Sequence, residues 1–301
     1  MQNREAEKLL VVENLTMEYQ TSRRLFEKKK PGVKAVNNVS FDVKEGETFG
    51  IVGESGCGKT TLGKCVVRLL QPASGKMYFN DNGEMKDLLS LNKKDSFELR
   101  KKLQIVFQDP YASLNPVHTI LEAFDEPMRI HGIGGGDKEK RKELIAKALE
   151  MVNLQPEYMY RYPHEFSGGQ RQRICVAKAL VLEPKLIVCD EPVSALDVSI
   201  QAQLLNLMRK LQKELGIAFV FIAHDLSVVQ YMSDRIAVMY LGNIVELADA
   251  DELYNNIKHP YTQALLSAVP IPVYNAKKKR IILEGDVPSP MNPPSGCPFH
   301  P

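Results

Sequence analysis

The sequence predicts an α/β protein built around a parallel β-sheet. Two apolar segments, Lys185–Cys189 and Ile217–Ala223, have the character of buried strands, and each precedes a stretch with helical periodicity. A third apolar segment, Thr48–Gly53, runs into a glycine-rich turn and then a predicted helix, Lys59–Leu70. Strands that alternate with helices form parallel sheets, because each helix carries the chain back to the start of the next strand.

The N-terminal part of the sequence predicts strands of another kind. Leu9–Asn14 is a short apolar run, and Val39–Val43 alternates between apolar and polar residues as an antiparallel strand does. Residues 20–34 between them are polar and basic, with a Pro-Gly pair near their end. This composition indicates a loop insertion.

The segment from about Asp109 to Phe166 predicts a helical insert within the α/β domain. Prolines at 110, 116 and 127 and glycines at 132 and 134–136 separate its helical stretches. The clearest helix is Asp137–Val152. Asp137 is a suitable N-cap, and apolar residues recur at 144, 145, 148, 149 and 152.

The composition indicates a globular protein and disfavours several other classes. Of 301 residues, 44% are hydrophobic and 25% are charged, and the net charge of +2 gives no sign of a nucleic-acid partner. The sequence has no run of about 18 apolar residues, and its N-terminus lacks the apolar core of a signal peptide. The five cysteines contain no C-x-x-C pair, which argues against a disulfide framework and for a reducing cytosol.

Two basic clusters have no assigned role in the sequence. One comprises Arg23, Arg24 and Lys28–Lys30, and the other is Lys277–Arg280. A solvated loop is one interpretation of each cluster, and contact with anionic lipid or a membrane partner is another.

The glycine-rich turn matches the phosphate-binding pattern G-x-x-x-x-G-K-[ST]. Its glycines let successive backbone N–H groups point into one anion cradle, and the following helix adds the positive end of its dipole. Lys59 is expected to reach the β- and γ-phosphates of ATP, and the Thr60 hydroxyl to ligate Mg²⁺. The expected phosphate-binding residues are Gly53, Glu54, Ser55, Gly56, Cys57, Gly58, Lys59, Thr60 and Thr61.

The thiol of Cys57 lies inside this turn. The helix N-terminus and Lys59 would both favour its thiolate, so the sequence predicts a thiol that reacts with maleimide and is protected by Mg·ATP. Burial of the side chain in the core is the alternative.

Two carboxylates follow the apolar residues Leu186–Cys189. Asp190, at the tip of the predicted strand, can hold Mg²⁺ through water. Glu191 can accept a proton from a water molecule that attacks the γ-phosphate. An apolar strand that ends in Asp-Glu is weak evidence alone, but with the phosphate-binding turn it predicts ATP hydrolysis.

A second glycine-rich turn, Ser167-Gly168-Gly169-Gln170, opens another predicted helix. A helix N-terminus is a second place to bind phosphate, and one nucleotide has no use for two such turns from the same subunit. The simplest arrangement places Ser167–Gln170 over the γ-phosphate that a partner subunit binds.

With this turn the sequence resembles the ATP-binding cassette (ABC) family, whose signature is LSGGQ. Phe166 stands here in place of the leucine, one apolar residue for another. The resemblance implies that Gln108, in IVFQDP, is the Q-loop glutamine, which senses Mg²⁺ and the transmembrane partner. The metal-binding set would then be Thr60, Gln108 and Asp190.

The same resemblance places three further elements. Ser194-Ala195-Leu196-Asp197 corresponds to the D-loop, with Ser194 and Asp197 as its functional residues. His224, in FIAHD, corresponds to the switch histidine that contacts the γ-phosphate. Tyr19 lies where the family stacks an aromatic ring on adenine, although core packing of Tyr19 or the aromatic residue Phe26 would also account for it.

The resemblance implies the fold of an ABC nucleotide-binding domain over residues 8–250. This P-loop NTPase fold has a RecA-like α/β core, an antiparallel β-subdomain and a helical subdomain near 109–166. Residues 251–301 would form a small C-terminal extension, possessing a helix near Tyr261–Ala268 and a proline-rich end from Pro288.

Longer segments narrow the resemblance to the ATPase subunits of bacterial oligopeptide and dipeptide importers. They are GESGCGKTT, QDPYASLNP, YPHEFSGGQRQRI, CDEPVSALDVSIQAQ, FIAHDLSVV, HPYTQALLSAVP and EGDVPSPMNPPSGCPFHP. The insertion before Val33–Val36 resembles the second ("F") of the two ATPase subunits. The resemblance implies a peripheral place at the cytoplasmic face of the cell membrane. The implied partners are a companion ATPase in a heterodimer, two membrane permeases and an extracytoplasmic peptide-binding protein.

The tail of this family usually carries further cysteines, which in some members bind an iron–sulfur cluster. Here Cys297 stands alone before the end at Pro301. One thiolate cannot hold a four-thiolate cluster, so no cluster is expected from the chain as given, whether the tail is truncated or the feature is absent.

Other functions stay open at this point. An importer ATPase for another solute, such as nickel or a sugar, fits because the ATPase does not touch the cargo. A non-transport ABC ATPase of translation or DNA repair is disfavoured, since the sequence has neither a second cassette nor a coiled-coil insert. A P-loop kinase or a regulatory nucleotide-binding module would leave the Ser167–Gln170 turn unexplained.

Overall fold

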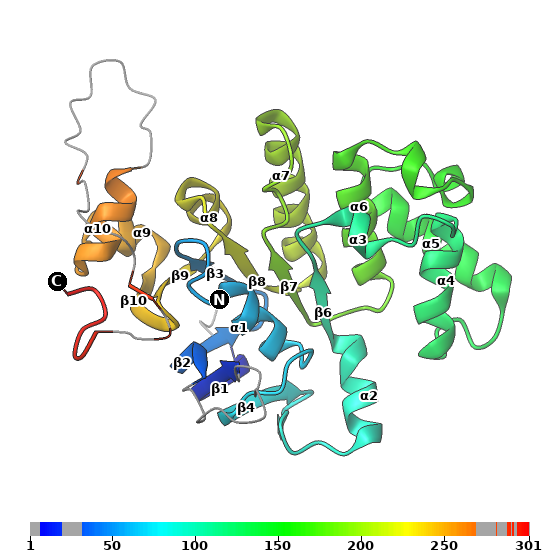
Figure 1. The fold of residues 1–301 in the computed structure, drawn as a ribbon. Helices are drawn as coiled ribbons and strands as arrows, with labels where there is room; N and C mark the ends of the chain where they lie inside the picture. The colour runs from blue at the N-terminus through cyan, green and yellow to red at the C-terminus, as the bar shows by residue number, and fades with distance from the viewer. Residues whose placement is uncertain are drawn as a thin grey trace, which may run out of the picture. The chain divides into compact units, whose positions relative to one another are not determined.

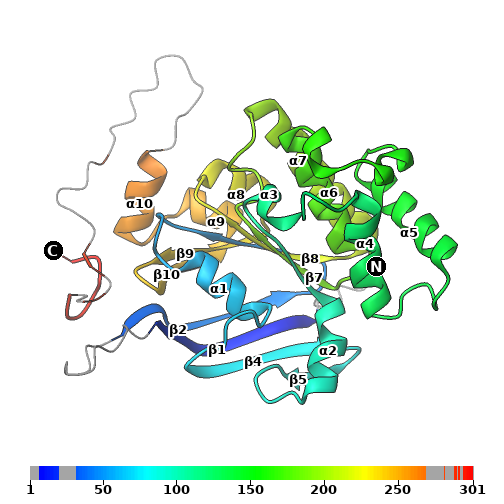
Figure 2. The same ribbon diagram turned by 45° about the vertical axis from the view of Figure 1, so that its right-hand side comes forward.

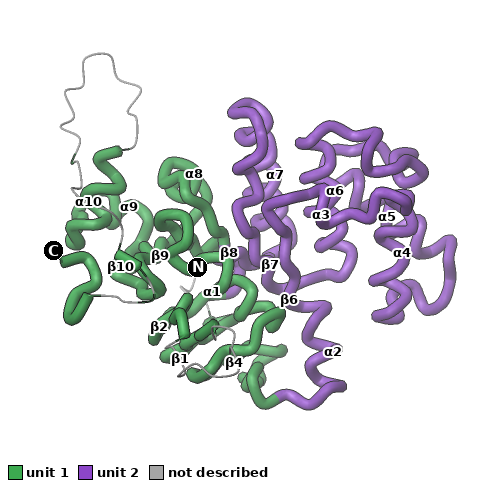
Figure 3. Tube along the Cα trace, viewed as in Figure 1, with its two compact units in different colours: residues 1–44, 48–90, 221–301 green, residues 45–47, 91–220 purple. Residues whose placement is uncertain are grey.

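The computed structural model describes residues 7–19, 32–268, 281, 288–289, 291 and 294–300. Both basic clusters and Phe26 lie outside the described residues. The chain divides into two compact units (Figure 3). Residues 1–44, 48–90 and 221–301 form unit 1, and residues 45–47 and 91–220 form unit 2. Each unit contains both helices and strands (Figure 1), so the predicted α/β class is confirmed.

Unit 1 contains a four-stranded antiparallel sheet in the order β2-β1-β4-β5. Its strands lie side by side in Figure 2 and are β1 (Lys8–Tyr19), β2 (Val33–Lys44), β4 (Ser74–Asp81) and β5 (Glu84–Asp87). β1 contains the apolar run Leu9–Asn14 and β2 contains the predicted antiparallel strand Val39–Val43, but both strands are longer than these segments. Their register shifts near Asn14 and Asn38, which adopt left-handed conformations, and pairing continues beyond these bulges.

A six-stranded sheet has the order β10-β9-β3-β8-β7-β6. Unit 1 holds β3 (Thr48–Val52), β9 (Arg235–Tyr240) and β10 (Asn243–Asp249), and β3 runs parallel to β9. Unit 2 holds β6 (Leu103–Val106) and β7 (Leu186–Asp190), which are parallel to each other. β8 (Ala218–Ala223) contributes residues to both units. β3, β7 and β8 are buried throughout, as their continuous apolar runs predict.

The first helix of unit 1, α1 (Lys59–Val66), ends before the predicted Leu70. Arg68 has a φ of 58°, and its N–H donates to the Cys65 carbonyl, while the Leu69 N–H donates to the Lys64 carbonyl. A left-handed residue just past the last turn closes a helix in this way. Further helices of the unit are α8 (Leu226–Met232), α9 (Ala250–Asn255) and α10 (Pro260–Ser267), the last of which matches the helix predicted there.

Every regular element of unit 2 between residues 109 and 166 is a helix. These elements are α3 (Pro110–Ser113), α4 (Ile120–Ile130), α5 (Lys138–Met151) and the 3-10 helices Pro156–Tyr160 and Pro163–Glu165. The unit also contains α2 (Lys93–Lys102), α6 (Gly168–Leu180) and α7 (Val198–Leu215). The Asp109–Phe166 segment is therefore helical, as predicted.

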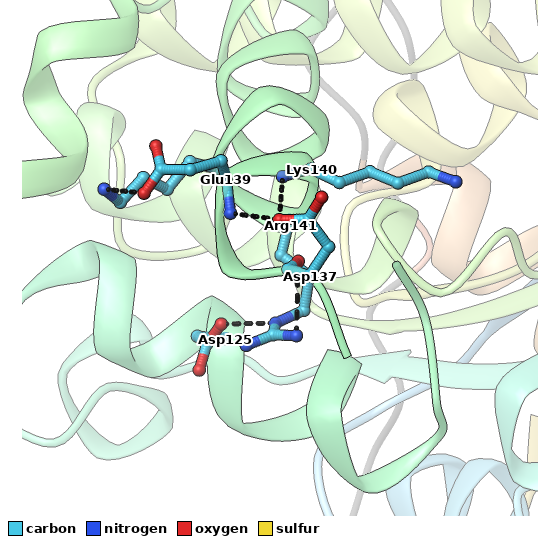
Figure 4. A network of polar contacts seen from close by, with 6 residues as sticks. Asp125, Asp137, Glu139, Lys140 and Arg141 are labelled. Carbon is cyan, nitrogen blue, oxygen red and sulfur yellow. Dashed lines mark hydrogen bonds and ion pairs between the residues drawn. The ribbon is translucent and has the colours of Figure 1, made fainter. Parts of the chain in front are cut away.

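The predicted helix Asp137–Val152 is present as α5. The Asp137 side chain accepts hydrogen bonds from the Glu139 and Lys140 backbone N–H groups, so it is the N-cap. Figure 4 shows this cap next to Arg141, whose Nε lies 2.6 Å from Asp125 Oδ1 of α4. Arg141 also donates from Nη1 to the Asp137 carbonyl at 3.3 Å. One buried guanidinium therefore links α4 to the start of α5.

Candidate active site

The predicted phosphate-binding turn lies in unit 1 between β3 and α1, in the strand-to-helix context that the motif requires. Gly56 and Gly58 have φ values of 82° and 106°, which favour glycine. A Cβ at Gly53 would lie 2.1 Å from the Met239 carbonyl oxygen, and one at Gly58 would lie 2.0 Å from the Ala35 carbonyl oxygen. These glycines therefore let the turn pass close to two neighbouring backbone segments.

The Lys59 side chain folds back beneath its own turn. Only 4% of the residue is exposed. Its Nζ donates to the carbonyl oxygens of Gly53 at 2.7 Å and Glu54 at 2.8 Å. A buried ammonium group needs such acceptors. Without them, the free energy that the group loses when it leaves water would not be recovered. The lysine and the turn therefore stabilise each other.

Two segments far along the chain hold the outside of the turn. The Gly242 N–H, between β9 and β10, donates to the Cys57 carbonyl at 2.9 Å. The Glu54 N–H donates to the Tyr261 hydroxyl at 3.0 Å. Gly242 and Tyr261 are absent from the predicted site. Local spacing in the sequence gives no sign of either contact, since each depends on the folded chain.

The prediction of a reactive Cys57 thiolate is wrong. The residue is 5% exposed, and burial raises the pKa of its thiol above the usual value; Lys59 acts in the opposite direction but is outweighed. The alternative, burial of the side chain, is what the structure has. Cys57 thus contributes to the turn through its backbone carbonyl and through its buried sulfur, which lies 3.8 Å from Lys59 Nζ.

Tyr19 lies at the end of β1 beside the start of α1. Its hydroxyl is 3.5 Å from the Thr61 Oγ1, and 43% of the residue is exposed. Thr60, the expected Mg²⁺ ligand, is exposed. His224, also exposed, follows the last residue of β8, and the next residue, Asp225, caps α8. All three residues are therefore exposed in unit 1.

In unit 2 the structure brings together three predicted residues from two distant segments. Gln108 Nε2 donates to Glu191 Oε2 at 3.1 Å and to Ser194 Oγ at 3.2 Å. The Ser194 hydroxyl donates to the Glu191 carbonyl at 3.0 Å. The parallel register of β6 and β7, with Val106 opposite Cys189, explains the meeting, since both segments leave the same edge of the sheet.

The backbone directs the two carboxylates differently. Asp190 ends β7 and is 5% exposed. Glu191 follows in a left-handed conformation with a φ of 47° and is half-buried. A residue other than glycine in this conformation is uncommon and often marks a functional position. The turn re-aims the Glu191 side chain toward Gln108.

The second glycine-rich turn is the N-terminus of α6. Ser167 is its N-cap, and Ser167 and Gln170 form a reciprocal capping box: Ser167 N–H donates to Gln170 Oε1 at 3.0 Å, and Gln170 N–H to Ser167 Oγ at 3.3 Å. A Cβ at Gly169 would lie 2.5 Å from Ile200 Cγ2 of α7, whose N-cap position is Asp197. Phe166, 4% exposed, packs edge-on against Tyr158. An apolar residue suffices there.

The described residues were compared with the requirements of a metal-binding cluster and of a membrane-spanning helix. No group of three or more His, Cys, Asp or Glu residues among them is placed to hold a metal ion. All five cysteines are free, and Cys297 is the exposed one. Within the described part of the chain, no helix combines the length and apolar character needed to cross a membrane.

Comparison with protein families and relatives gives consistent matches. A model of the ABC transporter family matches residues 36–194, and a model of the oligopeptide/dipeptide transporter C-terminal region matches residues 245–301. The oligopeptide transport ATP-binding protein AppF of Bacillus subtilis is 52% identical over 92% of this chain and 83% of its own length. The oligopeptide transport ATP-binding protein OppF of Haemophilus influenzae is 50% identical over 97% of this chain and 88% of its own.

Solved structures show the same likeness. A dimeric ATP-binding cassette, MJ0796, bound to ADP and Pi, is 28% identical, with a TM-score of 0.69 over 80% of this chain and 99% of that one. CbiO1 from Clostridium perfringens, part of the ABC transporter complex cbiONQ, is 26% identical, with a TM-score of 0.69 over 83% of this chain and 92% of that one.

The burial of Cys57 predicts slow thiol chemistry. With its pKa raised, the thiol stays protonated at pH 7 and gains thiolate only as the pH rises past the usual value for cysteine. At pH 7 a maleimide should therefore modify exposed Cys297 well before Cys57, as peptide mass spectrometry would record. Labelling of Cys57 at pH 7 as fast as that of Cys297 would contradict the structure.

Proposed function

The chain belongs to the ABC transporter family, and we propose that it is the ATP-hydrolysing subunit of a bacterial peptide importer. The observation that carries the hydrolytic assignment is the cluster of Gln108, Glu191 and Ser194 at the end of β7. In this cluster the Gln108 amide donates to the Glu191 carboxylate, which comes directly after the strand-terminal Asp190, and Ser194 bonds to the Gln108 amide and to the Glu191 backbone carbonyl. The peptide cargo is inferred from the names of the relatives.

Residues 53–61 bind the phosphates of ATP. Backbone N–H groups of the turn and the N-terminus of α1 attract the phosphate oxygens. Lys59 already faces carbonyl oxygens of this turn, and on binding its ammonium group would turn to the β- and γ-phosphates. The exposed ring of Tyr19, next to Thr61, stacks on adenine.

Thr60, Gln108 and Asp190 supply the oxygen ligands that Mg²⁺ prefers, a hydroxyl, an amide carbonyl and a carboxylate. When bound, Mg²⁺ neutralises charge on the β- and γ-phosphates. Glu191 accepts the proton of the attacking water, and Gln108 orients the Glu191 carboxylate through its amide N–H. His224 contacts the γ-phosphate from the end of β8.

Ser167–Gln170 serves the nucleotide of a companion subunit. Its capping box fixes the N-terminus of α6, and Ser167 is exposed there. Because each helix N-terminus can donate to one phosphate cluster, the turn at Lys59 and the turn at Ser167 serve different nucleotides. Ser194 and Asp197, in the segment leading to α7, complete the D-loop that faces the companion. MJ0796, the solved cassette bound to ADP and Pi, is a dimer.

The remaining partners are two membrane permeases and an extracytoplasmic peptide-binding protein, and the permeases hold the chain peripherally at the membrane. Unit 2 has a cavity of about 260 Å³, lined in part by Ile105, Phe107, Pro127 and Leu182. Phe107 directly precedes Gln108 in the sequence. Gln104, Ser113 and Lys178 also line the cavity, so a permease segment with both apolar and polar side chains would suit it, next to the residue expected to sense the permease. We place the ABC domain at 8–250, its helical subdomain near 109–166, and the C-terminal region at 251–301.

Glu191→Gln should leave ATP binding intact and lower turnover by about 100-fold or more, because the amide cannot accept the proton. The measurements are ATPase rate in the assembled transporter and ATP affinity of the purified chain. Glu183→Gln is the matched control, since Glu183 is another glutamate of unit 2 with a positive φ and should behave as wild type. Near-normal turnover of Glu191→Gln would remove Glu191 from the role of base.

Ser167→Arg should block hydrolysis at the companion's site while ATP still binds at Lys59 in the isolated chain. When the companion's own phosphate loop is inactivated, Ser167→Arg should change the residual turnover little. Asn92→Arg alters another exposed helix cap of unit 2 and should leave turnover unchanged in both complexes. Loss of ATP binding to the isolated Ser167→Arg chain would show that this turn serves its own subunit's nucleotide.

A further inference from the structure

Tyr261, in the segment HPYTQALLSAVP, contacts the phosphate-binding turn although it belongs to none of the nucleotide-binding motifs. It lies in the first turn of α10 and is completely buried. Its hydroxyl accepts a hydrogen bond from the Glu54 N–H at 3.0 Å, across 207 positions of sequence. A buried phenol therefore reaches the backbone of the turn that surrounds Lys59.

Tyr261 and Lys59 bind the two ends of one peptide group. The carbonyl of Gly53 accepts from Lys59 Nζ at 2.7 Å, and the N–H of the same peptide, on Glu54, donates to Tyr261. Because a peptide is planar, a rotation that breaks one hydrogen bond also breaks the other. Glycine at position 53 restricts such rotation less than any other residue would. An external partner for the N–H therefore also fixes the oxygen that holds the lysine.

The tyrosine is itself firmly held. Its ring lies 4.5 Å from that of Tyr240 in β9 and 5.5 Å from that of Phe299 in the C-terminal tail. The His259 Nδ1 accepts from the Tyr261 N–H and caps α10. Burial raises the pKa of the Tyr261 hydroxyl, so at neutral pH it stays protonated. A phenol so enclosed cannot follow the peptide if the peptide turns.

We propose that Tyr261 is a positioning residue for Lys59, so that the C-terminal helix α10 helps to set the affinity for ATP. By holding the Gly53–Glu54 peptide, Tyr261 keeps Lys59 pre-placed beneath the turn, where the lysine can pass from carbonyl oxygens to phosphate. The inference rests on the proposed role of Lys59 in phosphate binding.

The test compares Tyr261→Phe with Tyr254→Phe in the full chain. Each variant removes a phenol hydroxyl that hydrogen-bonds to the backbone of unit 1. Tyr261 is fully buried, and its hydroxyl accepts from the Glu54 N–H. Tyr254 is partly buried, and its hydroxyl donates to the Leu226 carbonyl. ATP affinity should fall about tenfold in Tyr261→Phe, the worth of one hydrogen bond, and stay near wild type in Tyr254→Phe. Deuterium uptake by a peptide covering residues 53–58 should rise in Tyr261→Phe only. The Tm should fall by similar amounts in both.

Lys59→Ala distinguishes a failure of the positioning role of Tyr261 from a failure of the proposed ATP site. If Lys59→Ala loses ATP affinity while Tyr261→Phe matches Tyr254→Phe in both affinity and deuterium uptake, the positioning role is overturned and the ATP site stands. If Lys59→Ala keeps wild-type affinity, the proposed ATP site is overturned, and the role of Tyr261 with it.

Discussion

The buried ammonium group of Lys59 is the constraint on which the rest of unit 1 depends. It can stay in the interior only because the carbonyls of Gly53 and Glu54 face it, and they face it only if the chain turns tightly after β3. That turn needs glycine where other backbone segments approach, and it is held from outside by Gly242 and Tyr261. The hairpin β9–β10 and the helix α10 therefore support the turn between β3 and α1 as well as the core.

The corresponding feature of unit 2 is the Glu191 carboxylate, which is held just after the end of the buried strand β7. The parallel pairing of β6 and β7 brings Gln108 beside Glu191, and the left-handed turn at Glu191 makes that contact possible. Ser194 then bonds to both residues. The family resemblance implied separate roles for Gln108 and Ser194, and the chemistry of the strand end implied the role of Glu191, whereas the structure shows the three residues as one hydrogen-bonded group.

The sequence predicts best where the information is local. The helix at Asp137 has a cap and a regular apolar period, and it forms as expected. By contrast, β10 is half-exposed along most of its length and carries charged residues, so no local pattern marks it, and pairing with β9 creates it. The error at Cys57 has the same origin, because its neighbours favour the thiolate but burial outweighs them. Tyr261 depends on a contact across 207 positions, which local patterns do not carry.

A crystal structure of the chain with a non-hydrolysable ATP analogue tests the central claim most directly. In that structure Lys59 Nζ is expected to have moved from the Gly53 and Glu54 carbonyls to an oxygen of the β- or γ-phosphate. The Glu54 N–H is expected still to donate to the Tyr261 hydroxyl. A nucleotide bound elsewhere, with Lys59 still on both carbonyls, would contradict the account.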